Sequence, residues 1–425
     1  MPTRRFSHEE LAEHVDLYLM LGRMLFQCGA TTQRIIDSIQ HLHDHLGTEE
    51  IHVLVSYDAI LITTTSGENF RTKIDQSRSF ASVNITQLME ISRYLRGLKD
   101  RELNVSGVRG ELERIRSMKG NFKLIPLLVA AGLTNVGFGF LNGGDTAALS
   151  IVFFSAIVIF MARHLLLGRG MNLYPATLLA VIAGGLVASA ATRCGVTATP
   201  IAAFVCPILF LIPGTPMING GMDVLRNHNA VGLSRMAFTI FMVLTISMGL
   251  AGAMAIIPLP TPTSHNIPLG LPLSVLLDGL FGAVAASGLA ILTNAPWRTI
   301  PLFAVCGAAS RLVRTGMVAL GIDPVASALM GTIACTIIAV LISQRSMVPR
   351  ITLAVTGVLT LVPGFFIIRG LKGLFLLSRT MGNPPPGAEI VMTLQCVLAA
   401  LFISVALIVG ILFPLMILDR LNQRI

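Results

Sequence analysis

The chain has 425 residues, of which 53% are hydrophobic and 12% charged, and its mean hydropathy is +0.75. Soluble globular domains carry about 25% charged residues, so this composition excludes an ordinary soluble enzyme and indicates a membrane protein. The charge is unevenly divided: residues 1–121 hold 15 basic and 16 acidic side chains, whereas residues 122–425 hold 16 and 6. We therefore predict a water-soluble N-terminal domain over residues 1–121, followed by a part that lies in lipid.

The N-terminal domain is predicted to have an α+β fold. Apolar residues recur at helical spacing from Leu11 to Leu25 and, after Gly29, from Ile35 to Leu46. Residues 50–74 are rich in β-branched side chains and are interrupted at 57–58 and 66–69, which predicts three short strands. Two further helices are expected at residues 84–98 and 107–119, the second as a solvated connector to the membrane.

From residue 122 onward, apolar stretches have about the 17–25 residues that a helix needs to cross a bilayer. Ten of them are found, at residues 122–142, 146–163, 173–192, 197–217, 234–257, 273–293, 298–318, 324–343, 350–368 and 388–416. The uncharged, proline-rich residues 258–272 follow the fifth stretch, and we interpret them as an extracytoplasmic linker. The linker separates two α-helical membrane modules of five helices each, residues 122–257 and 273–425.

The loop charges predict the orientation. If residues 1–121 are cytoplasmic, ten Lys and Arg side chains of the membrane part fall on the cytoplasmic side and four outside, as the positive-inside rule requires. The N-terminus lacks the apolar core of a cleavable signal peptide. We therefore predict a multi-pass protein of the bacterial inner membrane. Its net charge of +9 is spread over short loops, so the expected partner is the lipid bilayer and not a nucleic acid.

Several chemical functions are not indicated. The six cysteines form no close pair, so neither a disulfide framework nor a thiolate metal site is expected. Asp37, His41 and His45 share a helical face with a spacing that could ligate zinc, but a solvated helix face is the favoured interpretation. The motifs G-x-S-x-G, the P-loop and H-E-x-x-H are absent, so we expect neither an enzyme nor a cofactor.

Two segments repeat at an offset of 150 residues: L-I-P-G-T-P-M-I-N-G-G-M-D-V-L at 211–225 and L-V-P-G-F-F-I-I-R-G-L-K-G-L-F at 361–375. Lying five spans apart, they would cross the membrane in opposite directions, as parts of two inverted repeats. Inverted repeats interrupted by Pro and Gly are typical of secondary transporters. We place substrate binding at Pro213, Gly214, Pro363 and Gly364, where non-helical backbone exposes polar groups. The alternative is that each Pro-Gly is a kink tolerated by packing.

Charged residues inside predicted spans extend this site. Asp278 in the sixth span and Arg311 and Arg314 in the seventh lie about 22–27 Å from the turn between the two spans, at a rise of 1.5 Å per residue, so an ion pair is plausible. In the functional interpretation, Arg311 binds a substrate carboxylate and Asp278 carries the coupling proton or binds an ammonium group. The alternative is a structural pair near the outer interface, with Arg314 extended toward the water.

Polar residues beside the first break complete the candidate set. Thr215 and Asn219 would add neutral hydrogen bonds to the substrate. Asp223, Arg226 and His228 follow the first break, at the inner mouth of the predicted site. There they form a gate, and Asp223 is a second candidate for proton coupling. The alternative is a solvated loop.

Motifs throughout the chain resemble the threonine/serine exporter family in its long form, in which both membrane modules share one chain. Residues 21–35 (L-G-R-M-L-F-Q-C-G-A-T-T-Q-R-I) and 57–64 (Y-D-A-I-L-I-T-T) resemble its soluble domain, and residues 211–235 its first membrane module. N-A-P-W-R (294–298), G-A-A-S-R (307–311) and L-V-P-G (361–364) are similar to the second module. The resemblance matches Asp278 to an acidic position before N-A-P and Arg311 to the arginine of G-x-x-S-R.

The resemblance implies an exporter of small hydrophilic metabolites, threonine and serine in the best-known members, driven by the proton gradient. Relatives with the two modules on separate chains are linked to succinate, so a dicarboxylate exporter is the alternative. A membrane-anchored sensor or enzyme that acts through residues 1–121 is a less favoured alternative, and a channel is another. The expected partners are a small-molecule substrate, protons and lipid, and the sequence leaves a homo-oligomer open.

Overall fold

The computed structural model describes residues 6–47, 49–76, 83–100, 104–260, 270–346, 348–379 and 387–422. Most of the linker predicted at residues 258–272 lies outside these ranges. The described residues of 6–118, here called the N-terminal unit, contain four α-helices and three strands. These are α1 (His8–Gln27), α2 (Thr32–Leu46), β1 (Glu50–Val55), β2 (Ala59–Ser66), β3 (Asn69–Gln76), α3 (Ile85–Arg96) and α4 (Val105–Arg116).

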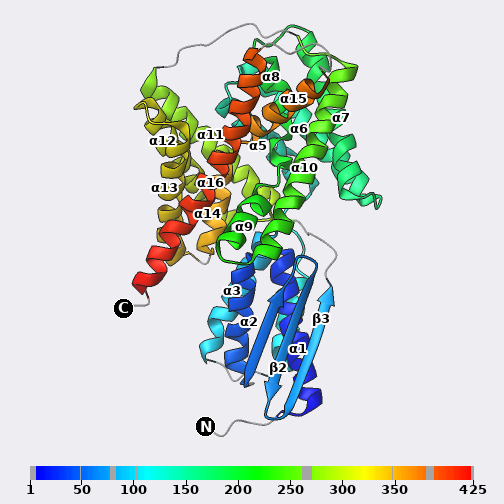
Figure 1. The fold of residues 1–425 in the computed structure, drawn as a ribbon, viewed down its shortest axis with the longest axis vertical. Helices are drawn as coiled ribbons and strands as arrows, with labels where there is room; N and C mark the ends of the chain where they lie inside the picture. The colour runs from blue at the N-terminus through cyan, green and yellow to red at the C-terminus, as the bar shows by residue number, and fades with distance from the viewer. Residues whose placement is uncertain are drawn as a thin grey trace.

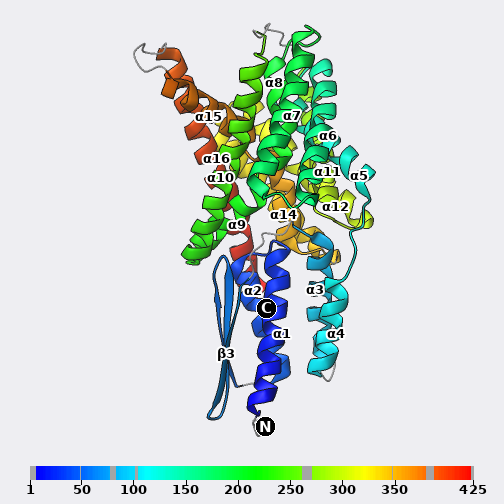
Figure 2. The same ribbon diagram turned by 90° about the vertical axis from the view of Figure 1, so that its right-hand side faces the viewer.

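The N-terminal unit is layered around helix α1. The helix begins at a capping box, in which Ser7 and Glu10 each bond the other's backbone N–H. Its predicted apolar face is fully buried, including Leu11, Val15 and Tyr18. The strands form an antiparallel sheet in the order β1-β2-β3. Figure 2 shows the sheet on one side of α1 and α2, and α3 with α4 on the other.

The membrane part consists of long apolar helices, as predicted. They are α5 (Leu124–Leu141), α6 (Thr146–Gly168), α7 (Leu173–Arg193), α8 (Pro200–Val205), α9 (Gly214–Leu225), α10 (Asn229–Ile256), α11 (Leu271–Leu292), α12 (Ile300–Ala319), α13 (Pro324–Arg345), α14 (Arg350–Val358), α15 (Gly364–Arg379) and α16 (Gly387–Asn422). Short 3-10 helices lie in the membrane part at η2 (Cys206–Leu211), η3 (Trp297–Thr299) and η4 (Leu359–Leu361), and one more, η1 (Gly97–Asp100), lies in the N-terminal unit.

The fourth and ninth predicted spans are not straight helices. In the described part of the chain, eight helices are long and apolar enough to cross a membrane, and two bent pairs raise the number to ten if each pair is one span. The first pair, α8–η2 with α9, bends by 59°, and the second, α14–η4 with α15, bends by 49°. Both bends occur at the repeated Pro-Gly, because proline lacks the N–H that would continue the helix.

Small residues allow helices of the two halves of the membrane part to approach closely. A Cβ added to Gly137 of α5 would lie 2.8 Å from the backbone oxygen of Phe281 in α11. One added to Gly288 of α11 would overlap Thr134 Oγ1 in α5. Such contacts are the usual means by which helices associate in lipid, where the hydrophobic effect does not drive them together.

The N-terminal unit lies at one end of the helix bundle, as Figure 1 shows. The C-terminal end of α16 lies at the same end of the bundle. Two turns between membrane helices make hydrogen bonds to the N-terminal unit: residues 226–228, between α9 and α10, and residues 293–296, between α11 and α12. Both turns therefore lie at the same end of the bundle.

Candidate functional site

The two Pro-Gly breaks have the same local geometry. The N–H of Gly214 donates to the Ile212 carbonyl at 2.7 Å, and the N–H of Gly364 donates to the Val362 carbonyl at 2.8 Å. A bond between residues i and i+2 defines a γ-turn, which is a tight reversal. After each turn a helix begins, α9 at Gly214 and α15 at Gly364. Each break therefore ends one half-helix and exposes the free N–H groups of the next.

The two breaks pack against each other, although they lie 150 residues apart in the sequence. A Cβ added to Gly214 would lie 2.5 Å from Leu359 Cδ2, in the 3-10 helix before the second break. A Cβ added to Gly364 would lie 2.8 Å from Ile212 Cδ1, just before the first break. A larger residue at either position would have to displace the end of one of these side chains, so glycine favours the close approach of the breaks.

A cavity of about 160 Å³ lies where the breaks meet. Its polar side chains are Arg311, Arg314 and Asn142, and its other lining residues are apolar side chains, Gly214 and the second break itself. No Asp or Glu side chain is among the described residues that line it. Of the predicted site residues, Gly214, Arg311, Pro363 and Gly364 line the cavity. Pro213 and Thr215 flank Gly214 but do not line it.

Arg311 connects the cavity to the second break. Its side chain is buried, and its Nη2 donates to the Thr360 carbonyl in η4. The neighbouring Ser310 donates through Oγ to the Gly357 carbonyl at 3.2 Å. Both side chains thereby satisfy carbonyl groups at the end of a half-helix, where the helix dipole favours a positive charge.

The cavity has the electrostatics of an anion site. The buried Nε atoms of Arg311 and Arg314 have no hydrogen-bond partner among the described residues. Two helices of opposite halves begin at this point, and the N-terminal end of a helix carries a partial positive charge. No carboxylate is among the described residues that line the cavity, so a ligand there would meet only positive charges and neutral groups. A carboxylate-bearing solute of small size meets these requirements.

The Asp278–Arg311 ion pair that we considered is not formed. Asp278 instead accepts a hydrogen bond from Thr315 Oγ1 at 2.6 Å. It makes no ion pair with Arg311 or Arg314 among the described residues. The Arg311 side chain instead donates to the Thr360 carbonyl in η4.

Asn219 and Asp223 lie at a second place, the contact with the N-terminal unit. Asn219 Nδ2 donates to the Gly29 carbonyl at 2.9 Å. Asp223 Oδ1 accepts from the Thr32 backbone N–H at 3.1 Å. The end of α9 is therefore covered by the turn between α1 and α2, and neither residue lines the cavity.

Arg235 of α10 holds the same turn. Its Nη1 lies 3.0 Å from Asp223 Oδ2, and its Nη2 donates to the Ala30 carbonyl at 2.8 Å. His228 Nε2 is 3.1 Å from Gln33 Oε1, which extends the contact along α2. Arg235 is a residue that our sequence analysis did not select, although it ends the G-L-S-R segment of the first-module motif.

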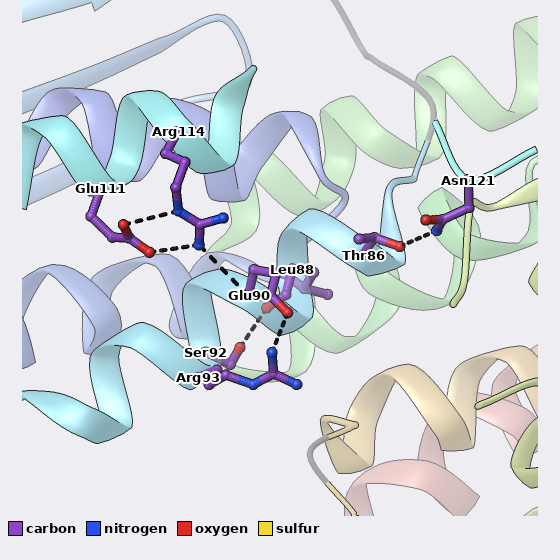
Figure 3. A network of polar contacts seen from close by, with 8 residues as sticks. All are labelled: Thr86, Leu88, Glu90, Ser92, Arg93, Glu111, Arg114 and Asn121. Atoms are coloured by element: carbon purple, nitrogen blue, oxygen red, sulfur yellow. Dashed lines mark hydrogen bonds and ion pairs between the residues drawn. The ribbon is translucent and has the colours of Figure 1, made fainter. Parts of the chain in front are cut away.

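Asn294 makes a second contact between the membrane part and the N-terminal unit. Its carbonyl accepts from Thr86 Oγ1 at 2.5 Å, and its Nδ2 donates to Asn84 Oδ1 at 3.0 Å. Asn121 joins this group through a 2.6 Å bond from Nδ2 to Thr86 Oγ1, which Figure 3 shows beside the ion pairs of α3 and α4. The role of Asn294 was not predicted from the sequence, because its partners are more than 170 residues away in the sequence. The N-A-P-W motif, which contains Asn294, is the signal that could have identified it.

Comparisons with known proteins indicate the family of this chain. A family model described as a putative threonine/serine exporter matches residues 16–257, and one described as threonine/serine exporter matches residues 278–417. A probable threonine/serine exporter of Mycobacterium tuberculosis is 20% identical over 407 residues, which cover 93% of this chain and 75% of the relative. The threonine/serine exporter of Corynebacterium glutamicum is 20% identical over 393 residues, 88% of this chain and 78% of the relative.

Just over half of the chain is also similar to a protein named as a succinate transporter subunit. A probable succinate transporter subunit of Escherichia coli (strain K12) is 25% identical over 244 residues, which cover 56% of this chain and 93% of that protein. No solved structure matches the chain.

Proposed function

Because this chain belongs to the threonine/serine exporter family, we propose that it is a secondary active exporter of threonine and serine that works by proton-coupled alternating access. Membership of the family supports export of small metabolites. It also supports the view that the protein is a transporter and not an enzyme. The cavity between the two Pro-Gly breaks is the observation that carries the proposal. It combines a broken backbone, two arginines and two helix N-termini inside a helix bundle, which is the usual composition of a transporter's substrate site.

Alternating access is supported by the correspondence between the two halves of the membrane part. Helices α8 and α14 begin 150 residues apart, at Pro200 and Arg350, and so do α9 and α15, at Gly214 and Gly364. If each bent pair is one span, each half has five spans, so corresponding helices run in opposite directions. Two inverted halves can exchange conformations by rocking around a site at their contact.

An amino acid fits the donors and acceptors of the cavity. Its carboxylate would bind Arg311, Arg314 and the N–H groups at the start of α9 or α15. Asn142 donates through Nδ2 to the Phe138 carbonyl at 2.7 Å, which leaves its Oδ1 to accept from the ammonium group. The small volume of the cavity favours substrates of the size of serine and threonine.

Succinate export is the second candidate, and one observation favours it. Two arginines line the cavity with no carboxylate among the described lining residues, so two substrate carboxylates could be bound at once. The similarity to a probable succinate transporter subunit points in the same direction.

Proton coupling is assigned in this proposal to Asp278, with Asp223 as the second candidate. Asp278 is half-buried beside the helix that carries Arg311 and Arg314, and it accepts a hydrogen bond from Thr315. Protonation would remove its charge and weaken its attraction for these arginines, which would change their availability to substrate. Asp223 would act differently, by releasing the turn between α1 and α2 when protonated.

The loop charges also support an orientation in the membrane. We place the N-terminal unit in the cytoplasm and the helix bundle in the bacterial inner membrane, as the loop charges predict. The unit then covers the cytoplasmic ends of α9 and α11, where it can control access to the cavity.

Counterflow in proteoliposomes tests the function. Vesicles preloaded with serine, threonine or succinate would receive labelled substrate outside, with and without a pH gradient. Proton-dependent uptake of labelled serine or threonine is the expected result. Flux of succinate alone would favour the second candidate, and the absence of flux for all three would contradict the proposed substrates.

A further inference from the structure

A second, larger cavity lies between the N-terminal unit and the membrane helices. Its volume is about 880 Å³, within the range of metabolite-binding pockets. The N-terminal unit forms one wall through α2 and the end of α3. The ends of α9 and α16 and the turn between α13 and α14 form the other. Its lining residues include Thr31, Arg34, Arg96, Arg226, Arg350 and Met416.

Four arginines face this cavity from four different elements. Arg34 lies on α2, Arg96 ends α3, Arg226 follows α9 and Arg350 begins α14. Asp37 is the one acidic residue among the described lining residues, and its Oδ1 accepts from Gln33 Nε2 at 2.8 Å. The lining therefore carries a net charge of +3, from four cations and one anion.

Arg34 and Arg226 are not neutralised by the protein. Neither forms an ion pair with a carboxylate among the described residues. Arg34 donates to the neutral Ser92 hydroxyl, a side chain that Figure 3 shows on α3. Burial and the nearby charge of Arg96 lower the pKa of Arg34 to about 10. Like charges gathered in a partly desolvated space are unfavourable unless an anion joins them.

The wall formed by the membrane part also carries apolar side chains. Leu225, Ile351, Leu415 and Met416 line it. Leu225 is 58% exposed and Met416 is 53% exposed, although both lie at the ends of helices that cross the bundle. The cavity thus places guanidinium groups beside apolar side chains, a combination that suits the headgroup and chains of an anionic lipid.

We propose that this cavity binds a ligand carrying phosphate groups, held by Arg34 and Arg96 from the N-terminal unit and by Arg226 and Arg350 from the membrane part. Guanidinium groups bind phosphate oxygens through paired hydrogen bonds, and two phosphates would engage four arginines. The headgroup of an anionic phospholipid and a soluble phosphate metabolite share this chemistry. Because the ligand contacts both parts, its binding stabilises the docked arrangement of the N-terminal unit.

Binding to the full chain in phosphatidylcholine nanodiscs tests the proposal without a transport assay. Pyrophosphate is titrated by calorimetry, and thermal unfolding is compared between phosphatidylcholine nanodiscs with and without cardiolipin. We expect either saturable pyrophosphate binding or a higher unfolding temperature with cardiolipin, and the two readouts distinguish the soluble ligand from the lipid. The effect should weaken as salt is raised, because it is electrostatic.

Arg226→Gln provides the site-specific variant, since Arg226 makes no ion pair among the described residues on which folding would depend. It should weaken pyrophosphate binding about tenfold or more, or remove the cardiolipin effect. Arg71→Gln, an exposed position on β3, is the matched control and should change neither readout. Equal responses of wild type and Arg226→Gln, equally strong competition by succinate or threonine, or no response to both probes would each overturn the proposal.

Discussion

Asp223 and Arg235 form a buried ion pair, with 3.0 Å between Asp223 Oδ2 and Arg235 Nη1 and with side chains 0% and 2% exposed. Each partner also binds the turn between α1 and α2: Asp223 through the Thr32 N–H and Arg235 through the Ala30 carbonyl. The pair therefore joins the membrane helices to the N-terminal unit.

Breaking this pair should destabilise the protein. Asp223→Asn leaves the Arg235 charge buried without a counter-ion, and we expect a loss of roughly 3–5 kcal/mol in the free energy of unfolding. Thermal unfolding measures the loss, and limited proteolysis at the α1–α2 turn reports release of the unit. The double variant Asp223→Asn/Arg235→Gln removes both charges and should recover part of the stability. A double variant less stable than the single one would contradict the importance of the pair.

An added methyl group should disturb the contact between the breaks. Gly214→Ala and Gly364→Ala each place a Cβ within 2.5–2.8 Å of a side chain in the other break. We expect a cost of roughly 1–3 kcal/mol in stability and a loss of export, measured by counterflow. Gly316→Ala on α12 has nothing within 4 Å of the new Cβ and is the control. Normal export by both break variants would show that the close contact is dispensable.

Arg314 should distinguish the two candidate substrates. It lines the cavity but, unlike Arg311, donates no recorded hydrogen bond to the second break among the described residues. Arg314→Gln should raise the KM for the exported carboxylate about tenfold or more, because a charged hydrogen bond is lost. Loss of succinate export with amino-acid export retained would favour the dicarboxylate. An unchanged KM for every substrate would remove Arg314 from the binding site.

Asp278→Asn should separate proton coupling from substrate exchange. The amide can still accept from Thr315 but cannot release a proton, so we expect counterflow to persist while transport driven by a pH gradient is lost. The measurement compares the two modes in the same vesicles. Thr315→Val is the matched control, since it removes the hydrogen bond but retains the carboxyl group. If gradient-driven transport survives in Asp278→Asn, Asp278 has a structural role.

Cys28 should react slowly with alkylating reagents. It is 1% exposed, and burial raises the pKa of its thiol to about 12, an effect that Arg34 opposes. The thiolate is the reactive form, so at pH 8 alkylation should be roughly a thousandfold slower than at an ordinary cysteine. The exposed Cys194 is the internal control, and peptide mass spectrometry measures both. Equal rates at the two cysteines in the wild type would contradict this buried environment.

The same thiol sets the sign of a pH effect on stability. The folded state keeps the Cys28 proton to higher pH than the unfolded state does, so the contribution to stability is present below about pH 9. This contribution falls as the pH rises from 9 toward 12. Thermal unfolding of the wild type and of Cys28→Ala, measured across this pH range, tests the expected decrease.

Some properties of the site were predictable because they depend on local sequence. Pro213 and Pro363 break their helices wherever those helices lie, since a missing N–H is a covalent property. Arg311 lies in the seventh predicted span, and helical spacing places it on the same face as Gly307, about one turn earlier. Asn219 and Asp223 were grouped with the cavity on proximity in sequence alone, and the fold places them against the N-terminal unit.

The sequence by itself determined the apolar spans, the amphipathic faces of α1 and α2, and the positions of both Pro-Gly breaks, because helix periodicity and backbone chemistry act over a few residues. Only the tertiary structure decided the partners of the charged groups. Asp223 meets Thr32 across 191 residues of sequence, and Arg311 meets Thr360 while Asp278 turns to Thr315. A buried polar group takes whichever partner the packed helices bring within hydrogen-bond distance, and no local pattern encodes that choice.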